Sequence, residues 1–242
     1  MRQSNSYIIL YSAALTVVCA LALAFASISL KDRQDANIAR EKKLNILSTV
    51  MTVDETADVD KLYSERITEK VVDFNGQVGA DKKASDIDVA KQYKEAAEKR
   101  QLPVYEVKST SNPEVVEFVV VPVYGYGLWN NIWGYVALKS DFNTIEGVKF
   151  QHAGETPGLG ARIEAAEIQD RYKGKTVFEA GKIASVVMQK GEVGNEKYAS
   201  EQHKVDGMSG ATLTGKGVNN MLQDYLQCYA NYLNSNQKAS NP

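Results

Sequence analysis

The chain contains little cysteine and has no large excess of charge of either sign, with a formal net charge of −2. Its 242 residues include 2 cysteines, Cys19 and Cys228, which lie far apart and outside any C-x-x-C pair or Cys/His cluster with metal-ligand spacing. We therefore expect no metal site built by this chain alone. The 28 basic and 30 acidic residues are intermixed, which leaves no basic stripe of the kind that binds nucleic-acid phosphates. This composition predicts no nucleic-acid partner.

Long apolar runs are also scarce, with one exception near the N-terminus. Residues 7–30 contain no charged side chain, and as a helix at about 1.5 Å per residue the run would reach about 36 Å. Such a helix crosses a hydrocarbon core of about 30 Å, so we predict a transmembrane helix at 7–30 in contact with the lipid bilayer. The alternative is a signal peptide, with Arg2 as its basic end and Ala24-Phe25-Ala26 as a cleavage-like pattern. The run exceeds the usual apolar region of about 7–15 residues, which favours the retained anchor.

The charges around this run leave the orientation of the chain open. Only Arg2 precedes the run, whereas several basic residues follow it, namely Lys31, Arg33, Arg40, Lys42 and Lys43. The positive-inside rule then favours a cytoplasmic C-terminal side, although a large following domain can be translocated regardless of charge.

The rest of the chain is typical of an α+β fold. Residues 31–52 predict a helical stalk, and residues 58–74 and 86–100 are helical by composition, with acidic residues early and basic residues late. Short β-branched and aromatic runs then predict a mainly antiparallel sheet, with strands at 104–108, 116–124, 133–139 and 145–152.

A glycine-rich loop follows the predicted sheet. Residues 154–175 predict this loop leading into an amphipathic helix, and residues 183–189 predict a further strand. The apolar stripe of the last helix repeats with a 3.6-residue period through Val218, Met221, Leu222, Tyr225, Leu226, Tyr229 and Leu233. Cys228 borders this stripe, which predicts a partly buried structural thiol.

A second glycine-rich stretch, residues 205–217, precedes that last helix. Residues 210–216 match the first seven positions of a phosphate-binding P-loop, but Gly217 stands where a Mg²⁺-binding hydroxyl is required. On the pattern alone, a plain helix cap with Ser209 or Thr212 as the acceptor is the favoured interpretation. In either case a helix start with free N–H groups stabilises an anion such as a phosphate.

Residues 206–212 resemble the flavinylation motif D-x-x-(S/T)-G-A-T, in which the hydroxyl of the last threonine is esterified to the phosphate of FMN. The longer form SGATLT resembles that of the C-type flavin subunit of the sodium-translocating NADH:quinone reductases, within the FMN-binding domain family. Further matches to this family are found at residues 127–129, 133–138, 143–145 and 155–161.

The resemblance implies a set of cofactor-binding residues and no catalytic or metal-binding ones. Thr212 would carry FMN through a phosphoester made by a separate flavin transferase. The recognition residues would be Asp206, Ser209, Gly210 and Ala211, and the second wall of the flavin site would be Glu155, Thr156, Gly158, Leu159 and Gly160. Trp129 and Tyr126 are candidates to shield the ring, but buried packing is the favoured interpretation for both.

The resemblance also implies a function and a location. The chain would be a membrane-anchored electron-transfer subunit with covalent FMN, in a sodium-pumping complex that oxidises NADH and reduces a quinone such as ubiquinone. Its partners would be the flavin and iron–sulfur subunits of that complex, in a cell inner membrane, with the soluble domain on the periplasmic side. The alternatives are the paralogous G-type subunit of the ferredoxin-linked Rnf complex and a membrane-tethered non-redox binding module.

These expectations divide the chain into a short N-terminal tail (1–6), a transmembrane helix (7–30), a helical stalk (31–52), an FMN-binding domain (53–234) and a polar tail (235–242).

Overall fold

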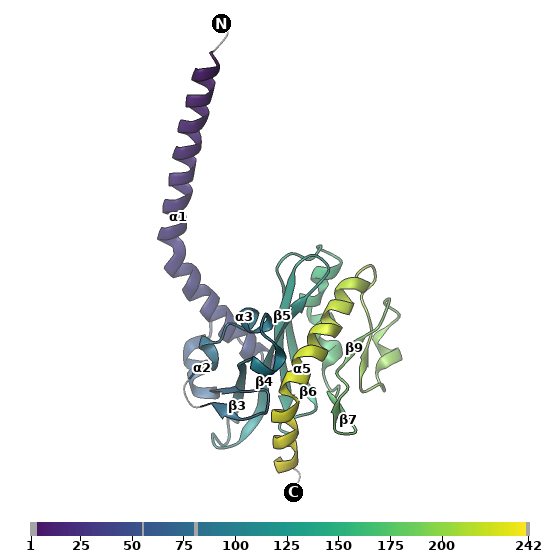
Figure 1. The fold of residues 1–242 in the computed structure, drawn as a ribbon. Coiled ribbons are helices and arrows are strands. Elements are labelled where there is room, and N and C mark those ends of the chain that lie inside the picture. Colours follow the sequence, from purple (N-terminus) through teal and green to yellow (C-terminus); the bar gives the residue numbers. More distant parts are fainter. Residues whose placement is uncertain (1–3, 55, 80–81, 241–242) are drawn as a thin grey trace. The chain divides into compact units, whose positions relative to one another are not determined.

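The computed structural model describes residues 4–54, 56–79 and 82–240. The expected N-terminal tail therefore lies partly outside the described residues, as do Arg2 and the last two residues of the expected polar tail. The chain forms two compact units, which divide between Lys43 and Leu44. Figure 1 shows the elements of both units.

The first unit is helical. Helix α1 (Asn5–Ser48) runs through both the expected membrane span and most of the expected stalk. Its apolar residues within the first unit are exposed, including Leu21, Phe25 and Ile28. By length and composition it is able to cross a membrane, as the sequence predicts. The helix ends at Ser48, so residues 49–52 of the expected stalk are not helical.

The second unit is built on a six-stranded sheet with the strand order β2-β1-β3-β4-β5-β6, and every neighbouring pair is antiparallel. This confirms the predicted α+β class with a mainly antiparallel sheet. The strands are β1 (Ile67–Val72), β2 (Val78–Gly79), β3 (Leu102–Lys108), β4 (Val116–Tyr126), β5 (Asn131–Lys139) and β6 (Ile145–His152). Strands β4 and β5 form a long hairpin whose last pair is Tyr126 and Asn131.

Alternate residues of β4 face opposite sides of the sheet, because side chains of a strand alternate. Val119 and Val121 belong to a large core with the C-terminal helix α5 (Thr212–Ser240), whereas Val120 belongs to a second core. The second core contains Ile46 and Leu47, near the C-terminal end of α1. The sheet is therefore covered on both faces.

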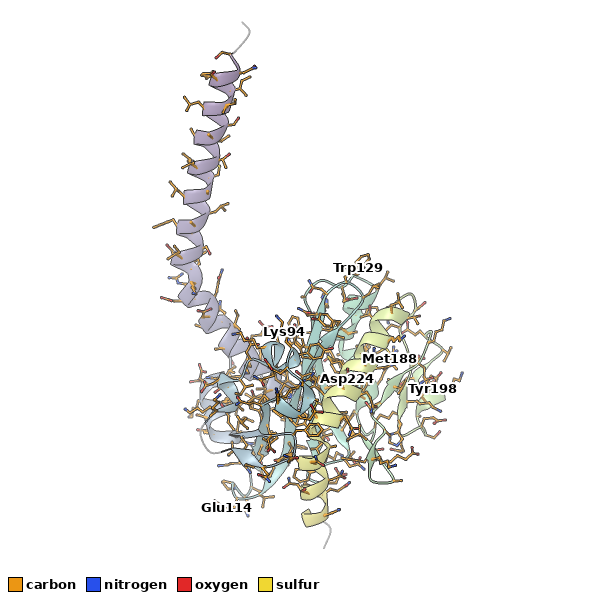
Figure 2. The ribbon with its side chains drawn as sticks, in the orientation of Figure 1. Lys94, Glu114, Trp129, Met188, Tyr198 and Asp224 are labelled. Carbon is orange, nitrogen blue, oxygen red and sulfur yellow. The ribbon has the colours of Figure 1, made fainter. Side chains whose placement is uncertain are left out.

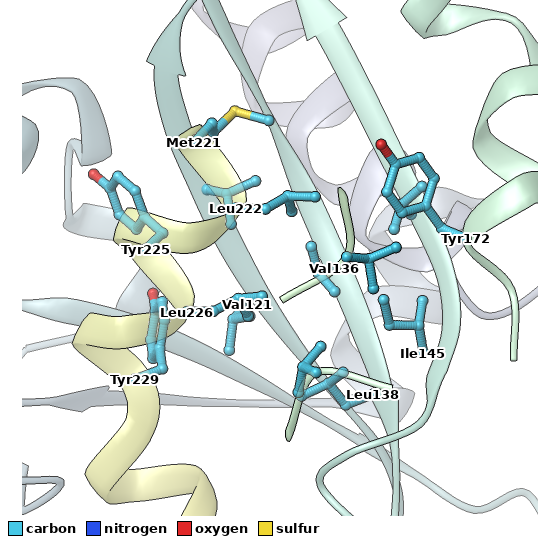
Figure 3. Close-up of a cluster of buried hydrophobic side chains, with 14 of the residues drawn as sticks. Val121, Val136, Leu138, Ile145, Tyr172, Met221, Leu222, Tyr225, Leu226 and Tyr229 are labelled. Carbon is cyan, nitrogen blue, oxygen red and sulfur yellow. The ribbon is translucent and has the colours of Figure 1, made fainter. Parts of the chain in front are cut away.

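Helix α5 lies across one face of the sheet (Figure 1), and its apolar stripe is buried there as the 3.6-residue period predicts. Leu222 and Leu226 point toward Val121 and Val136 of the sheet (Figure 3). Cys228 is buried and donates to the carbonyl of Asp224, in agreement with a structural thiol. The helix is longer than expected, because residues 235–240 of the expected polar tail are helical.

The predicted helix at 58–74 is wrong in its second half. Helix α2 (Val59–Arg66) ends where β1 begins, and β1 pairs with β3 from Ile67–Val107 to Val72–Leu102. The β-branched residues of β1 gain this pairing and bury Val71 and Val72, which outweighs local helix propensity.

Other predicted helices are shorter than expected. Residues 86–100 contain α3 (Val89–Tyr93) and a 3₁₀ turn, and residues 154–175 contain α4 (Ala166–Gln169) between 3₁₀ turns. The predicted strand at 183–189 is split, because Ser185 has a φ of 58°. The short strands of this region are β7 (Phe178–Glu179), β8 (Lys182–Ile183), β9 (Val187–Met188) and β10 (Lys204–Val205). The 3₁₀ turns of the second unit are η1 (Ala84–Asp86), η2 (Ala97–Lys99), η3 (Gly160–Glu164), η4 (Asp170–Tyr172) and η5 (Asn195–Tyr198).

A methyl group added at two glycines of α5 is expected to have different effects on stability. A Cβ at Gly217 would collide with the backbone carbonyl of Tyr126 and lie 3.0 Å from Gly127 Cα, whereas one at Gly215 would meet the flexible Met188 Sδ at 3.0 Å. Gly→Ala in a helix normally stabilises by about 0.5–1 kcal/mol. We expect Gly217→Ala to destabilise the protein by about 1–3 kcal/mol in denaturant unfolding, because backbone cannot move aside easily. Gly215→Ala, the matched control, should be close to neutral; equal losses would contradict this account.

Candidate functional site

Three segments far apart in the sequence meet at one end of the strands of the sheet. They are the β4–β5 turn (residues 127–130), the loop after β6 (residues 153–160) and the segment that leads into α5 (residues 206–214). The β5–β6 register places Ile132 beside His152, so the turn and the loop leave the sheet at the same end. Together they form a pocket of about 190 Å³, lined by Leu128, Glu155, Thr156, Leu159, Gly160, Gly210, Ala211, Thr212, Leu213 and Thr214.

Thr212 is the first residue of α5, and its side chain is exposed. The N–H of Ala211 bonds to the carbonyl of Met208 (3.2 Å), and the N–H of Gly215 makes a helical bond to the carbonyl of Ala211 (3.0 Å). The amides of residues 212–214 thus lie in the first turn, where a helix offers no acceptor. This is also the positive end of the helix dipole. The site can stabilise an anion joined to the Thr212 hydroxyl.

The residues just before Thr212 form a sharp entry to the helix. Gly210 has a φ of 74°, and a Cβ there would lie 2.8 Å from Leu159 Cδ2. Ser209 is exposed, and its backbone N–H donates to Glu192 Oε2 (3.2 Å). Glycine at 210 therefore permits both the backbone turn and the contact between the two motifs.

Glu155 is turned inward. Its side chain is buried, Oε2 accepts from the Thr214 hydroxyl (2.6 Å) and Oε1 accepts from the Trp129 amide (2.9 Å). Burial alone would raise its pKa, but the bonds from Thr214 and from the amides of Trp129, Asn130 and Leu128 outweigh it, and the pKa of Glu155 lies below its usual value. The carboxylate thus joins all three segments of the site.

Asp206 also points into the protein. It is buried, and its carboxylate accepts from the amides of Val193 (3.0 Å) and Gly194 (2.9 Å). Arg171 lies 3.9 Å from this carboxylate and donates to the carbonyl of Gly207 (2.5 Å). Asp206 therefore ties the start of the segment that leads to Thr212 to the loop at residues 193–194.

An ion-pair network that the sequence motifs do not reveal supports the same segment. Glu192 accepts from Arg162 at both carboxylate oxygens (2.9 Å each), from Arg171 (2.7 Å) and from the Ser209 amide. These charge-assisted bonds hold the pKa of Glu192 far below its usual value. Charged residues scattered along a sequence are usually solvated surface side chains. No feature of the sequence therefore identifies Glu192, Arg162 and Arg171 as partners.

The loop after β6 is a tight turn closed by its own backbone. The carbonyl of Thr156 accepts from the amides of Leu159 and Ala161 (3.1 Å each), and Gly158 has a φ of 75°. Gly160 is buried, and a Cβ there would lie 2.5 Å from both Glu155 Oε2 and Thr214 Oγ1. Gly158 therefore permits the backbone turn, whereas Gly160 permits the close approach of the loop to α5.

Large apolar side chains of the pocket and of the adjoining β4–β5 hairpin are not buried. Leu128, Leu159 and Leu213 are 47%, 41% and 58% exposed, and Trp129 is 69% exposed at the end of the β4–β5 hairpin (Figure 2). Tyr126 is 56% exposed. The expectation that Trp129 and Tyr126 pack in the interior is wrong: Trp129 lies in the turn beyond the last β4–β5 pair, and Tyr126 contacts Tyr93 with one edge but leaves most of its ring exposed.

Comparison with known proteins agrees with this geometry. The family profile described as FMN-binding domain matches residues 127–227, which contain all three segments. The NqrC subunit of the Na⁺-translocating NADH-quinone reductase of Pseudomonas aeruginosa is 34% identical over 245 residues, covering 93% of this chain and 92% of the relative. The chain belongs to the NqrC family of the Na⁺-translocating NADH-quinone reductases.

Another relative and a solved structure lead to the same family. The NqrC subunit of Vibrio anguillarum is 31% identical over 229 residues, covering 88% of this chain and 87% of the relative. The crystal structure of the NqrC subunit from Parabacteroides distasonis matches with a TM-score of 0.72 at 34% identity, over 84% of this chain and 96% of that one.

The Glu192 network predicts a pH dependence of stability. The pKa of Glu192 is lowered in the folded state, so its contribution is complete above its unfolded pKa of about 4.3 and is lost as the pH falls below that value. We expect the melting temperature of the wild type to fall between about pH 5 and pH 3, and Glu192→Gln to flatten this fall. Glu196→Gln, a nearby exposed carboxylate, is the control and should retain the wild-type slope.

Proposed function

We propose that the chain carries FMN esterified through its phosphate to the Thr212 hydroxyl, and acts as an electron-transfer subunit of a Na⁺-translocating NADH:quinone reductase. The observation that carries the proposal is the exposed Thr212 hydroxyl at the first turn of α5, inside the segment matched by the FMN-binding domain.

The phosphate end of FMN suits the residues at this helix start. The amides of residues 212–214 and the positive end of the dipole favour a phosphodiester on Thr212. Gly210 leaves the approach to the helix free of a side chain, and both nearby carboxylates, Glu155 and Asp206, are bonded within the protein. Donors of the protein therefore partly neutralise both carboxylates, which reduces their repulsion of the phosphate.

The ring end of FMN suits the apolar surroundings. The pocket of about 190 Å³ is smaller than the roughly 300–1,000 Å³ of a site that encloses a whole ligand. Part of the ring then lies against Leu128, Trp129, Leu159 and Leu213, which are apolar and exposed. When bound, the flavin supplies reversible uptake and release of electrons, and the protein sets its position and its access to solvent.

Attachment needs a partner enzyme. A flavin transferase would join the Thr212 oxygen to the phosphorus of an activated flavin donor, remove the hydroxyl proton and release the leaving group. That enzyme would bind the recognition segment at residues 206–211. Thr156 is exposed on the opposite wall, where its hydroxyl is available to the ribityl chain or ring.

The relatives favour one assembly. The proteins from Pseudomonas aeruginosa and Vibrio anguillarum are both NqrC subunits of the Na⁺-translocating NADH-quinone reductase, which supports this complex over the Rnf paralogue and over a non-redox module. We propose that α1 anchors the chain in the inner membrane among the other subunits, and that the flavin domain lies on the periplasmic side.

Substitution of Thr212 tests the attachment site. We expect Thr212→Val, expressed with the flavin transferase, to abolish ultraviolet-excited flavin fluorescence of the band on a denaturing gel, because the accepting oxygen is gone. Thr212→Ser keeps a hydroxyl and should keep measurable fluorescence. Thr110→Val, an exposed threonine in a distant turn, should equal the wild type. Fluorescence retained in Thr212→Val would show that another residue carries the flavin.

Reporter fusions test the side of the membrane. We expect alkaline phosphatase joined after Pro242 to be active, and green fluorescent protein at the same point to be dark, because the first folds only outside the cytoplasm and the second only within it. The reverse pattern would favour the orientation predicted by the basic residues after the span.

A further inference from the structure

The three segments of the site converge on one buried carboxylate. Glu155 comes from the loop after β6, the Trp129 amide from the β4–β5 turn and the Thr214 hydroxyl from α5. Both of these partners donate to the carboxylate, and an ionised carboxyl group only accepts. The group therefore fits this position in its charged form.

Two glycines leave the space that this carboxylate fills. A Cβ at Gly127 would collide with Glu155 Oε1, and one at Gly160 would lie 2.5 Å from Oε2. Both glycines are in the segments that resemble the family, and neither has a positive φ. Their small size is needed to bring the carboxylate against both neighbouring segments.

The carboxylate is also close to the attachment point. Glu155 and Thr212 line the same pocket, and the Glu155 carboxylate bonds to Thr214, two residues after Thr212. A charge that is 4% exposed is weakly screened by water and salt, so it acts on neighbouring groups more strongly than a surface charge.

We propose that Glu155 is a positioning and electrostatic residue of the cofactor site. Its carboxylate ties the three segments together around Thr212 and holds a fixed negative charge beside the flavin, which lowers the reduction potential of the flavin. Electrons taken up by the flavin add negative charge, and a fixed negative charge nearby makes that uptake less favourable. This inference rests on the proposed attachment of FMN at Thr212.

Two substitutions at the same hydrogen bond predict shifts of opposite sign. In Glu155→Gln the negative charge is removed while the shape is kept, and the amide can still accept from Trp129 and donate to the Thr214 oxygen. We expect the flavin midpoint potential to rise. In Thr214→Val the hydroxyl that donates to Glu155 is removed. The negative charge of Glu155 stays and is less neutralised by hydrogen bonds. We expect the midpoint potential to fall, whereas Thr214→Ser keeps the donor and should match the wild type.

The measurement is a spectroelectrochemical titration of the full-length flavinylated chain in detergent at pH 7, in which the electrode supplies the electrons. Glu164→Gln is the matched control, because it removes one carboxylate charge whose side chain is 46% exposed, and the potential should not change. A purely structural role of Glu155 would loosen the site in both Glu155→Gln and Thr214→Val. It would therefore move both potentials in the same direction, which would overturn the proposal.

The outcomes separate this inference from the proposed function. A wild-type chain without covalent flavin overturns the attachment at Thr212 itself. A flavinylated wild type whose potential is unchanged in Glu155→Gln overturns only the role of the charge. If Glu155→Gln does not accept flavin, the midpoint potentials of Thr214→Val and Thr214→Ser are compared instead. Equal potentials in these two variants would overturn the proposal.

Discussion

The packing of α5 against one face of the sheet is the constraint on which the site depends. The buried stripe from Val218 to Leu233 fixes the rotation and height of this helix, and so determines where its first turn lies. Gly217, in the second turn of α5, brings the helix against the backbone of Tyr126 at the end of β4. The first turn, whose amides have no acceptor within the helix, therefore lies at the end of the sheet where the β4–β5 turn and the loop after β6 leave the strands. A shift of one helical turn, about 5.4 Å, would separate Thr212 from both of them.

The two acidic residues of the motifs illustrate how a binding motif can act through the protein itself. Glu155 and Asp206 do not face the pocket as bare charges. Each accepts backbone amides, from residues 128–130 and from residues 193–194 respectively. Bonds from loop amides partly neutralise such a carboxylate, so it fixes the loops while repelling a nearby phosphate less than a bare carboxylate would.

The extent of what the sequence could predict follows from the range of the interactions involved. The strands from β3 to β6 and the stripe of α5 were predictable, because alternation and a 3.6-residue period are local signals. Strand β1 is not predictable from local signals, since its identity depends on pairing with β3, from Val72–Leu102 to Ile67–Val107. The Glu192 network was invisible for the same reason, because Arg162, Arg171 and Ser209 meet it only in three dimensions. The inward direction of Glu155 and the exposure of Trp129 likewise depend on tertiary packing.

The small volume of the pocket bears on why a flavin here would be esterified at all. A cavity of about 190 Å³ gives a nucleotide too little buried surface for a long residence time. A bond to Thr212 makes retention independent of contact area, because loss then requires hydrolysis of an ester instead of simple dissociation. The ring can then stay open to solvent and to redox partners for the lifetime of the protein. With FMN esterified at Thr212 as proposed, retention and accessibility, which oppose each other in an ordinary binding site, would be separate properties of this one.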